Sequence, residues 1–329
     1  MKNFYQGKSI LITGAAGSIG QALTDQLLEY DPKVIRLFDN NENGLFYLRQ
    51  KYAGEREKKV RFLLGDIRNL NRLQYAFQGI DIVIHAASYK HVTECEYNPL
   101  DAVETNILGT ANVIQAAIYQ HVKKVIFTSS DKAANPSNTM GTTKLLAEKL
   151  MIAANDYGAR STVFSCCRFG NVVGTSGSVI PLFKKQIMES NRVTITDPAM
   201  TRFMITQKTA IDLVLKAGIL SEGGEIFIFK MPVVRIDDLA DAMIARYGNA
   251  TKTVIGKKPG EKMYEEIMTE EEMTRSYEGK DMYIIFPQTQ KINYSNYAGY
   301  SPVSNIRHSS QLPILPRHEI YALLDEAGI

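Results

Sequence analysis

A glycine-rich loop near the start of the chain constrains its fold more than any other feature. Residues 14–20 read GAAGSIG, directly after the short apolar run 8–13 and directly before an amphipathic stretch. Glycine at such places permits a tight turn and lets the backbone approach a pyrophosphate at a helix N-terminus. The spacing is GxxGxxG rather than GxGxxG, so the loop alone would also fit an ordinary turn. We expect a nucleotide to contact Gly14, Gly17, Ser18, Ile19 and Gly20.

Short apolar runs in the first half of the chain alternate with longer amphipathic stretches. The runs are continuously apolar, as is typical of parallel strands that are covered on both faces. The expected strands are 8–13, 33–38, 59–64, 81–85, 123–128 and 162–168. The expected helices lie near 20–30, 43–54, 70–77, 99–120 and 139–157. This alternation predicts an α/β fold with a Rossmann-like, doubly wound parallel sheet.

The length of 329 residues corresponds to about two domains. We expect residues 1–170 to form the nucleotide-binding domain, with late sheet elements contributed from about 204–236. Residues 171–329 should form mainly a smaller, discontinuous α/β substrate domain. Within it, the charged stretch 261–273 (EKMYEEIMTEEEM) is interpreted as a helix, and the tail from about 288 as a less regular segment.

The composition is that of a globular protein and excludes several functional classes. Hydrophobic residues make up 45% and charged residues 22%, which excludes a disordered chain. A net charge of +3 gives the whole chain no attraction to nucleic acid or to a membrane surface. Three cysteines without CxxC spacing and five histidines without HxxxH spacing indicate neither disulfides nor a metal site. Because no apolar run approaches the ~20 residues that span a bilayer, we expect a cytoplasmic protein.

Acidic residues after two of the expected strands complete a candidate cofactor site. Asp39 follows 33–38, where a carboxylate can bind the ribose hydroxyls of an adenosine and repel a 2′-phosphate. Asp66 follows 59–64 and could reach the adenine amino group. We therefore favour NAD over NADP. The local alternatives are a loop cap for Asp39 and a helix N-cap for Asp66.

A polar cluster follows the fifth expected strand. Ser130, Asp131 and Lys132 come directly after 123–128, and the carboxyl ends of strands in an open α/β sheet are where ligands bind. Lys144 follows twelve residues later. Met140 precedes Lys144 by four residues, which places both side chains on one helix face.

These positions resemble the extended short-chain dehydrogenase/reductase superfamily, and within it the UDP-N-acetylglucosamine 4,6-dehydratases. The narrower resemblance rests on Ser-Asp-Lys-Ala-Ala-Asn-Pro and on four later strings. The five strings lie at 130–136, 168–172 (RFGNV), 177–181 (GSVIP), 196–203 (TDPAMTRF) and 258–262 (KPGEK). Residues 39–42 and 87–92 look like the branch that retains the configuration at C5. That branch often carries an additional membrane segment, and we expect a soluble form without it.

The resemblance implies a dehydration with no net consumption of cofactor. NAD would take a hydride from C4 of the sugar, water would leave across C5 and C6, and the hydride would return to C6. The product would be UDP-2-acetamido-2,6-dideoxy-alpha-D-xylo-hex-4-ulose. Lys132 would be the base at C5 and Asp131 the acid at C6. Both roles require the neutral form, so we expect burial to raise the pKa of Asp131 and to lower that of Lys132.

Met140 stands where the superfamily carries the tyrosine that deprotonates the C4 hydroxyl. A thioether cannot act as a base. Lys144, Ser130 or a water held between them are the alternatives for this step. Lys144 would also bind the nicotinamide ribose.

The resemblance also implies the other ligand contacts. Arg202 would bind the diphosphate bidentately, and Glu261 would lie near the uridine ribose. Lys258 replaces an arginine of the family and keeps its charge without the planar fork. Further substrate contacts would come from Lys90, Asn171, Ser178 and Val179. Further cofactor contacts would come from Ile67, Ala86, Ala87 and Asn106.

Other functions fit the same frame. A C5-inverting dehydratase differs in the face of C5 that is reprotonated, which residue types do not decide, and a 4-epimerase of a UDP-sugar would not need Asp131 and Lys132. A non-catalytic NAD-sensing protein is favoured by Met140 and opposed by the intact acid–base residues. The helices near 99–120 and 139–157 resemble the pair that packs into a four-helix bundle in family dimers. We therefore expect a homodimer or higher homo-oligomer.

Overall fold

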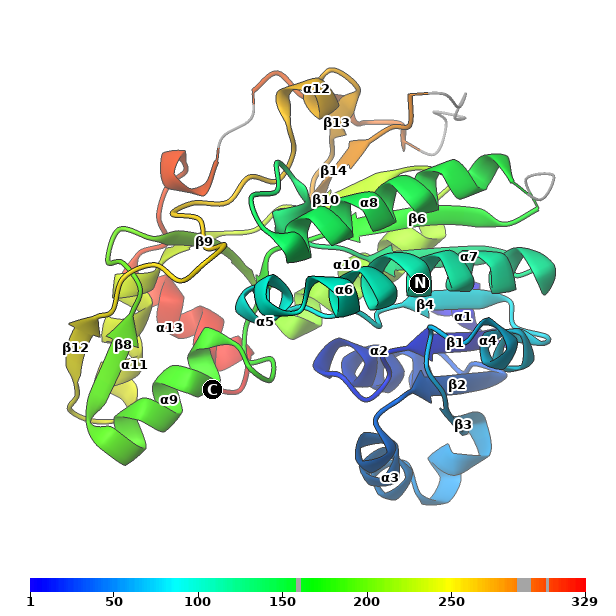
Figure 1. Cartoon of the computed structure of the whole chain (residues 1–329), viewed down its shortest axis with the longest axis horizontal. Helices are drawn as coiled ribbons and strands as arrows, with labels where there is room; N and C mark the ends of the chain where they lie inside the picture. The colour runs from blue at the N-terminus through cyan, green and yellow to red at the C-terminus, as the bar shows by residue number, and fades with distance from the viewer. Residues whose placement is uncertain (158–160, 289–296, 306–307) are drawn as a thin grey trace.

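The structure is a computed structural model that describes residues 1–157, 161–288, 297–305 and 308–329. Its largest element is a ten-stranded sheet in the order β15-β13-β14-β10-β6-β5-β4-β1-β2-β3 (Figure 1). The seven strands from β10 to β3 in this order run parallel, and β14, β13 and β15 add an antiparallel edge. The strands are β1 Ser9–Thr13, β2 Val34–Asp39, β3 Val60–Leu64, β4 Ile82–His85, β5 Lys124–Thr128, β6 Val163–Arg168, β10 Ile226–Phe229, β13 Ser276–Glu278, β14 Met282–Ile285 and β15 Ser301–Pro302.

The first six strands confirm the predicted doubly wound α/β fold, each within one residue of its expected bounds. Their apolar side chains alternate between two cores, one on each face of the sheet. In β1, Ile10 and Ile12 pack into one core and Leu11 into the other. A strand that is buried on both faces needs no polar alternation, which explains the continuous apolar runs.

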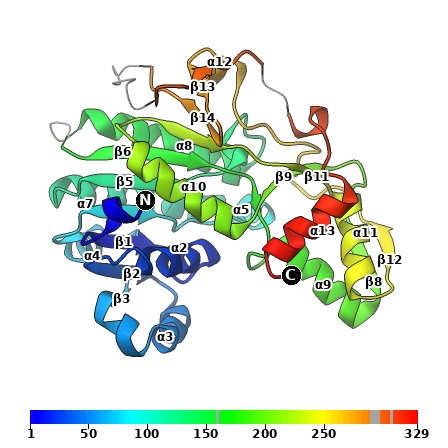
Figure 2. The same ribbon diagram turned by 180° about the vertical axis from the view of Figure 1, so that it is seen from behind.

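Helices cover both faces of the main sheet (Figures 1 and 2). One face carries α2 Ser18–Leu28, α3 Glu42–Lys51 and α10 Gln207–Leu220. The other carries α4 Leu70–Phe77, α7 Gly109–Tyr119 and α8 Thr139–Ala153. A short helix, α1 Lys2–Tyr5, precedes β1.

The helix predicted over 99–120 is interrupted. The chain forms α5 Val92–Tyr97 and α6 Pro99–Ala102, then a π-helical turn η2 over Val103–Leu108, and only then α7. Such π turns add a residue to the helix and often occur at functional sites. Here the turn carries the buried Asn106.

A smaller region lies beside the carboxyl ends of the parallel strands (Figure 1). It contains a three-stranded sheet, β11-β9-β7, and a two-stranded sheet, β12-β8. Of the late segment 204–236, only β10 joins the main sheet. The strands of this region are β7 Asn171–Val172, β8 Arg192–Ile195, β9 Thr201–Ile205, β11 Val233–Arg235 and β12 Thr251–Val254. Its helices, α9 Val179–Ser190, α11 Ile236–Tyr247 and α13 Arg317–Glu326, share a core separate from those of the main sheet.

Of two predictions for the second half, the first is wrong and the second holds only for the described part of the tail before Arg317. The stretch 261–273 is helical only at α12 Glu270–Met273, where Thr269 and Glu272 form a capping box. Upstream, the chain is not helical, and the backbone carbonyls of Lys262 and Met263 accept hydrogen bonds from Arg202. The tail from about 288 ends in the regular helix α13. Residues 289–296 and 306–307 of that tail lie outside the described residues.

Among the described residues, no helix combines the length and the apolar character needed to cross a membrane.

Candidate active site

Two glycines of the loop, Gly14 and Gly20, are packed too closely to carry a side chain. Gly14 has a φ of +68°, and a Cβ there would lie 2.7 Å from the backbone nitrogen of Ala87. A Cβ on Gly20 would overlap the carbonyl oxygen of Gly14. The loop therefore leaves bare backbone before the first turn of α2, which fits the pyrophosphate of a dinucleotide.

Asp39 and Asp66 lie at the ends of β2 and β3 and already have partners. Asp39 accepts hydrogen bonds from the backbone nitrogens of Ala16 at 2.8 Å and Asn41 at 2.9 Å, as a loop cap would. Asp66 pairs with Arg68 at 2.8 Å, which lowers the pKa of Asp66. The N-cap of α4 is Asn69, so the N-cap alternative for Asp66 is wrong.

Buried polar side chains form hydrogen bonds next to the glycine loop. His85 bonds Thr13 on β1 at 2.7 Å and Thr110 on α7 at 3.1 Å. Burial lowers the pKa of His85 to about 3, so the ring is neutral. Asn106 bonds the backbone nitrogen of Tyr89 at 2.8 Å and its oxygen at 3.2 Å. The other residues expected to contact the cofactor lie nearby. The Ala87 nitrogen donates to Thr13, and Ala86 follows His85. Ser18 and Ile19 begin α2, and Ile67 lies against Gly109.

Lys144 bridges the ends of two adjacent parallel strands. Its Nζ donates to Ser88 Oγ at 2.7 Å and to the Thr128 carbonyl at 3.0 Å. Burial lowers the pKa of Lys144 to about 8. A lysine with this pKa exchanges its proton near neutral pH.

Met140 lies inside α8 and packs in a small apolar cluster with Cys95 and Ala102. Its side chain is buried. Packing therefore accounts for the methionine without any chemical role.

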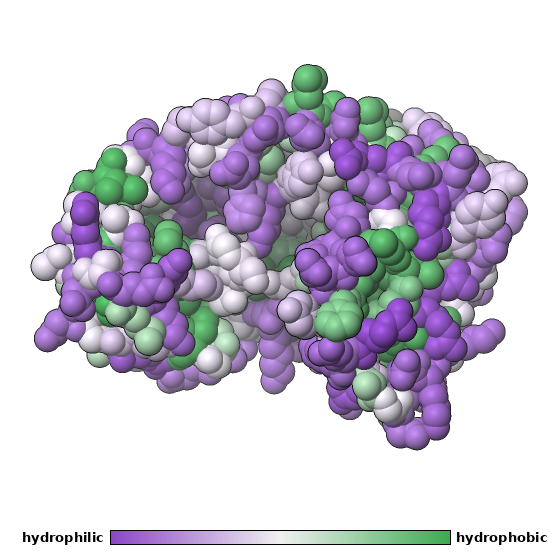
Figure 3. All heavy atoms as spheres, turned by 60° about the horizontal axis from the view of Figure 1, so that its bottom comes forward, coloured by the Kyte–Doolittle hydropathy of each residue, from purple (hydrophilic) through white to green (hydrophobic). Residues whose placement is uncertain are grey.

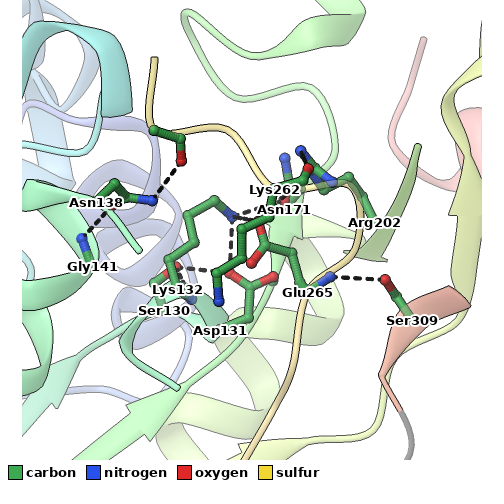
Figure 4. Close-up of polar contacts among 12 residues, drawn as sticks. Ser130, Asp131, Lys132, Asn138, Gly141, Asn171, Arg202, Lys262, Glu265 and Ser309 are labelled. Atoms are coloured by element: carbon green, nitrogen blue, oxygen red, sulfur yellow. Dashed lines mark hydrogen bonds and ion pairs between the residues drawn. The ribbon is translucent and has the colours of Figure 1, made fainter. Parts of the chain in front are cut away.

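Asp131 and Lys132 form the centre of an acid–base cluster (Figure 4). Asp131 is fully buried, and its Oδ1 accepts from Lys132 Nζ and from Ser130 Oγ, both at 2.9 Å. Asn171 Oδ1 accepts from Lys132 Nζ at 3.4 Å. The structure thus brings the predicted acid and base together with Ser130 and Asn171.

The expected lowering of the Lys132 pKa is wrong. Burial alone would lower it, but Asp131 and Glu265 outweigh burial and raise the pKa of Lys132 above its ordinary value. Lys132 is therefore an ammonium ion at neutral pH. The sequence argument considered one neighbouring carboxylate, whereas the structure supplies two.

Glu265 is the member of the cluster that the sequence did not reveal. Its Oε1 lies 3.6 Å from Lys132 Nζ and 3.8 Å from Arg202 Nε. It falls in the segment that was interpreted as a helix, so nothing linked it to Lys132. The only available signal was an acidic residue three positions after the KPGEK string.

A buried ion triad anchors the segment that follows Glu265. Arg168, at the end of β6, pairs with Glu148 of α8 at 2.6 Å and with Glu272 of α12 at 3.0 Å. It also donates to the carbonyl of Ile267 at 2.9 Å. The triad ties the segment around 267–272 to the main sheet.

The expected substrate residues fall into three groups. Arg202 joins the acid–base cluster, where its guanidinium donates to the carbonyls of Thr201 and Lys262. Lys90 donates to the Ser176 carbonyl at 2.7 Å, which places it beside the turn that leads to Ser178 and α9. The third group is an exposed turn, in which the Lys258 nitrogen donates to Glu261. Ser178 is the N-cap of α9, Val179 is its first residue, and the Ser178 hydroxyl is buried without a partner among the described residues.

The surface is hollowed between the two regions of the molecule (Figure 3). A pocket of about 310 Å³ is lined by Tyr89, Lys90, His91 and Glu94, among others. It follows directly on Ser88, the partner of Lys144. The residues that line this pocket all belong to 89–101, and most of them are polar.

Comparisons with known proteins agree with this arrangement. A family profile described as "Polysaccharide biosynthesis protein" matches residues 10–287. A "UDP-N-acetylglucosamine 4,6-dehydratase (inverting)" of Campylobacter jejuni is 41% identical over 292 residues, covering 88% of this chain and 86% of the relative. A "UDP-glucose 4-epimerase" of Rickettsia bellii is 40% identical over 296 residues, with the same coverage of 88% and 86%. The X-ray structure of Pen from Bacillus thuringiensis has 42% identity, covers 98% of both chains and superposes with a TM-score of 0.92.

Proposed function

Because the chain belongs to this family of polysaccharide biosynthesis proteins, we propose that it is a UDP-N-acetylglucosamine 4,6-dehydratase. Its product would be UDP-2-acetamido-2,6-dideoxy-alpha-D-xylo-hex-4-ulose. The observation that carries the proposal is the buried contact of 2.9 Å between Asp131 and Lys132 at the end of β5. A hydro-lyase needs an acid and a base at adjacent carbons, and this pair supplies both.

NAD is the proposed cofactor. The loop 14–20 would hold its pyrophosphate, Asp39 and Asp66 would face the adenosine, and Lys144 would bind the nicotinamide ribose. When bound, NAD supplies a hydride acceptor for C4 and a hydride donor for C6. We assign residues 1–170 mainly to the cofactor and the segments of the smaller region mainly to the sugar nucleotide.

Asp131 and Lys132 carry the loss of water. A shift of one proton from Lys132 Nζ to Asp131 Oδ1, across 2.9 Å, gives a neutral amine and a neutral carboxylic acid. The amine takes the C5 proton, which a C4 ketone makes acidic. Asp131 gives its proton to the C6 hydroxyl, and that oxygen leaves as water.

Lys144 is the proposed acceptor of the C4 hydroxyl proton. Its pKa of about 8 allows proton exchange near neutral pH, whereas the Ser130 hydroxyl is already bonded to Asp131. Met140 supplies no base and fills an apolar cluster.

The sugar nucleotide would lie along the hollow, with Lys90, Asn171, Ser178, Val179 and Arg202 on its walls. Arg202 would exchange its backbone carbonyl partners for the diphosphate. Glu261 and Lys258 would reach the uridine from their exposed turn.

Two alternatives are each favoured by one named relative. An inverting dehydratase is favoured by the Campylobacter enzyme, and a 4-epimerase by the Rickettsia enzyme. We keep dehydration with retention at C5, because Asp131 and Lys132 suit water loss and residues 87–92 resemble the retaining branch.

Exposed apolar side chains in the helices near 99–120 and 139–157 support a homodimer or higher homo-oligomer. Leu100, Leu108 and Tyr119 are 78%, 54% and 67% exposed. Leu146 of α8 is 42% exposed. A second copy that covers this face would remove these side chains from water.

Proton NMR of the purified protein with UDP-N-acetylglucosamine in deuterated water tests the proposal. A new C6 methyl signal with deuterium at C5 is expected, and the ring couplings then report the C5 configuration. A product with an intact C6 hydroxyl and an inverted C4 would instead establish the epimerase. Unchanged substrate in the presence of folded, NAD-loaded protein would contradict both activities.

A further inference from the structure

Glu265 is a buried carboxylate in the acid–base cluster, and no step of the proposed reaction uses it. Only 3% of its side chain is exposed. Its Oε1 lies 3.6 Å from Lys132 Nζ and 3.8 Å from Arg202 Nε. Its backbone is fixed by two hydrogen bonds to Ser309, at 2.9 and 3.0 Å. The carboxylate therefore has a defined position toward the proposed base.

The groups that face Glu265 come from three parts of the chain. Asp131 and Lys132 follow β5, Arg202 lies on β9, and Lys262 lies on its own segment. His308 is close in sequence to Ser309, but its ring stacks on Tyr264. The buried core of the cluster thus holds two cations, Lys132 and Arg202, against two carboxylates.

Each carboxylate has one oxygen that faces a cation and one that has no partner among the described residues. Asp131 Oδ1 and Glu265 Oε1 face Lys132. Asp131 Oδ2 and Glu265 Oε2 are buried without a hydrogen-bond partner within the part of the chain that the structure describes. A buried unpaired carboxylate oxygen is costly. These two oxygens are therefore free to accept a proton within the cluster.

The proposed water loss needs one proton, neither more nor fewer, on the Asp131–Lys132 pair. With two protons, Lys132 has no lone pair with which to accept the C5 proton. With none, Asp131 has no proton to give to the C6 hydroxyl. With one, the cycle balances. The amine gains the C5 proton, the C5–H electron pair forms the double bond to C6, and the C6–O pair leaves with the proton of Asp131 as water.

We propose that Glu265 is a positioning residue whose negative charge keeps this single proton on the Asp131–Lys132 pair. The inference rests on the proposed dehydratase activity for its catalytic meaning. Glu265 acts through Lys132 rather than on the sugar. A negative charge at 3.6 Å favours the ammonium form of a lysine, and the raised pKa of Lys132 follows from Asp131 and Glu265 together.

The pH dependence of turnover in Glu265→Gln tests the proposal. Loss of the negative charge lowers the pKa of Lys132, so the pair loses its proton at a lower pH. The alkaline decline of kcat should therefore begin about one pH unit or more below that of the wild type. Identical alkaline declines in the two proteins would overturn the inference.

Two further variants separate charge from structure. Glu265→Asp keeps the charge on a shorter side chain, and its alkaline decline should lie closer to the wild type than that of Glu265→Gln. A decline that matches Glu265→Gln would show that charge is not the cause. Glu266→Gln, at the next position and outside the cluster, should leave the profile unchanged, and a shift of equal size there would also overturn the inference.

A direct titration keeps the inference testable if Glu265→Gln does not fold. The Nζ of Lys132 can be followed by NMR in ¹⁵N-lysine-labelled wild-type protein and assigned by its absence in Lys132→Met. Its titration midpoint should lie above the ordinary lysine value of about 10.4. A midpoint below that value would overturn the inference. This measurement requires no turnover, so failure of the methyl signal in the wild type would contradict the dehydratase proposal alone.

Discussion

The glycine loop and the acid–base cluster lie at the same edge of the main sheet, but they are held together in different ways. The loop lies within residues 14–20, and its nearest contacts are backbone atoms of its own turn and of Ala86 and Ala87. The cluster joins side chains from three distant places: Asp131 and Lys132, then Arg202, and finally Glu265. The loop depends on the absence of side chains at Gly14 and Gly20, and the cluster depends on the charges of its side chains. Substitutions should therefore act through shape in the loop and through electrostatics in the cluster.

Lys132→Ala should have the largest effect on the reaction, and it changes the cluster without changing the loop. Removal of the base should lower the rate of C5 deuterium incorporation by roughly 10³- to 10⁴-fold, as is typical of general-base residues. Bound NAD should remain, because the loop is untouched. The measurement is NMR of the sugar in deuterated water together with the absorbance of released cofactor. Full exchange at C5 in this variant would show that another group is the base.

Arg168→Met should have the largest effect on stability. It leaves Glu148 and Glu272 buried without their cation, which typically costs about 3–5 kcal/mol. Chemical denaturation should show this loss in the free energy of unfolding. Arg235→Met is a matched control, because Arg235 also pairs with a carboxylate, Asp238, but at an exposed site. Equal losses of unfolding free energy in the two variants would mean that burial of the triad contributes nothing to stability.

Gly14→Ala tests the role of shape in the loop. Both the positive φ and the 2.7 Å approach to Ala87 oppose a side chain there. We expect NAD affinity to fall by roughly tenfold or more, which corresponds to at least ~1.4 kcal/mol. Gly79→Ala is a close control, because Gly79 has a φ of +66° but open space around it. If both variants lost cofactor equally, backbone strain rather than the close approach would be the cause.

Met140→Tyr should have the smallest effect on the reaction. Met140 packs with Cys95 and Ala102 in a small apolar cluster, so a larger polar ring there should cost about 1–3 kcal/mol of stability. The rate should change less than tenfold if Lys144 takes the C4 proton. A rate increase of a hundredfold would instead show that the centre lacks a base that tyrosine can restore. Thermal unfolding and the NMR assay measure the two effects.

The sequence predicted the loop and the main sheet well because their signals are local. Six strands appear as continuous apolar runs, and Gly14 and Gly20 lie in the motif that their packing requires. The antiparallel edge and the cluster were harder, because no local pattern reports which distant residues meet. Glu265 was missed because its segment was predicted to be a helix. In the structure, backbone carbonyls of this segment accept hydrogen bonds from Arg202 and Ser309. Without Glu265, the direction of the Lys132 pKa shift was also wrong.

The antiparallel edge of the main sheet has a consequence for association. Its last strand, β15, consists of Ser301 and Pro302 alone. An edge strand this short offers few free backbone groups, and proline has no N–H with which to pair another chain. At this edge the sheet is therefore protected against the addition of strands from other molecules and against the aggregation that such pairing causes. Copies of this protein can therefore associate through their helices, because pairing of strands at that edge is disfavoured.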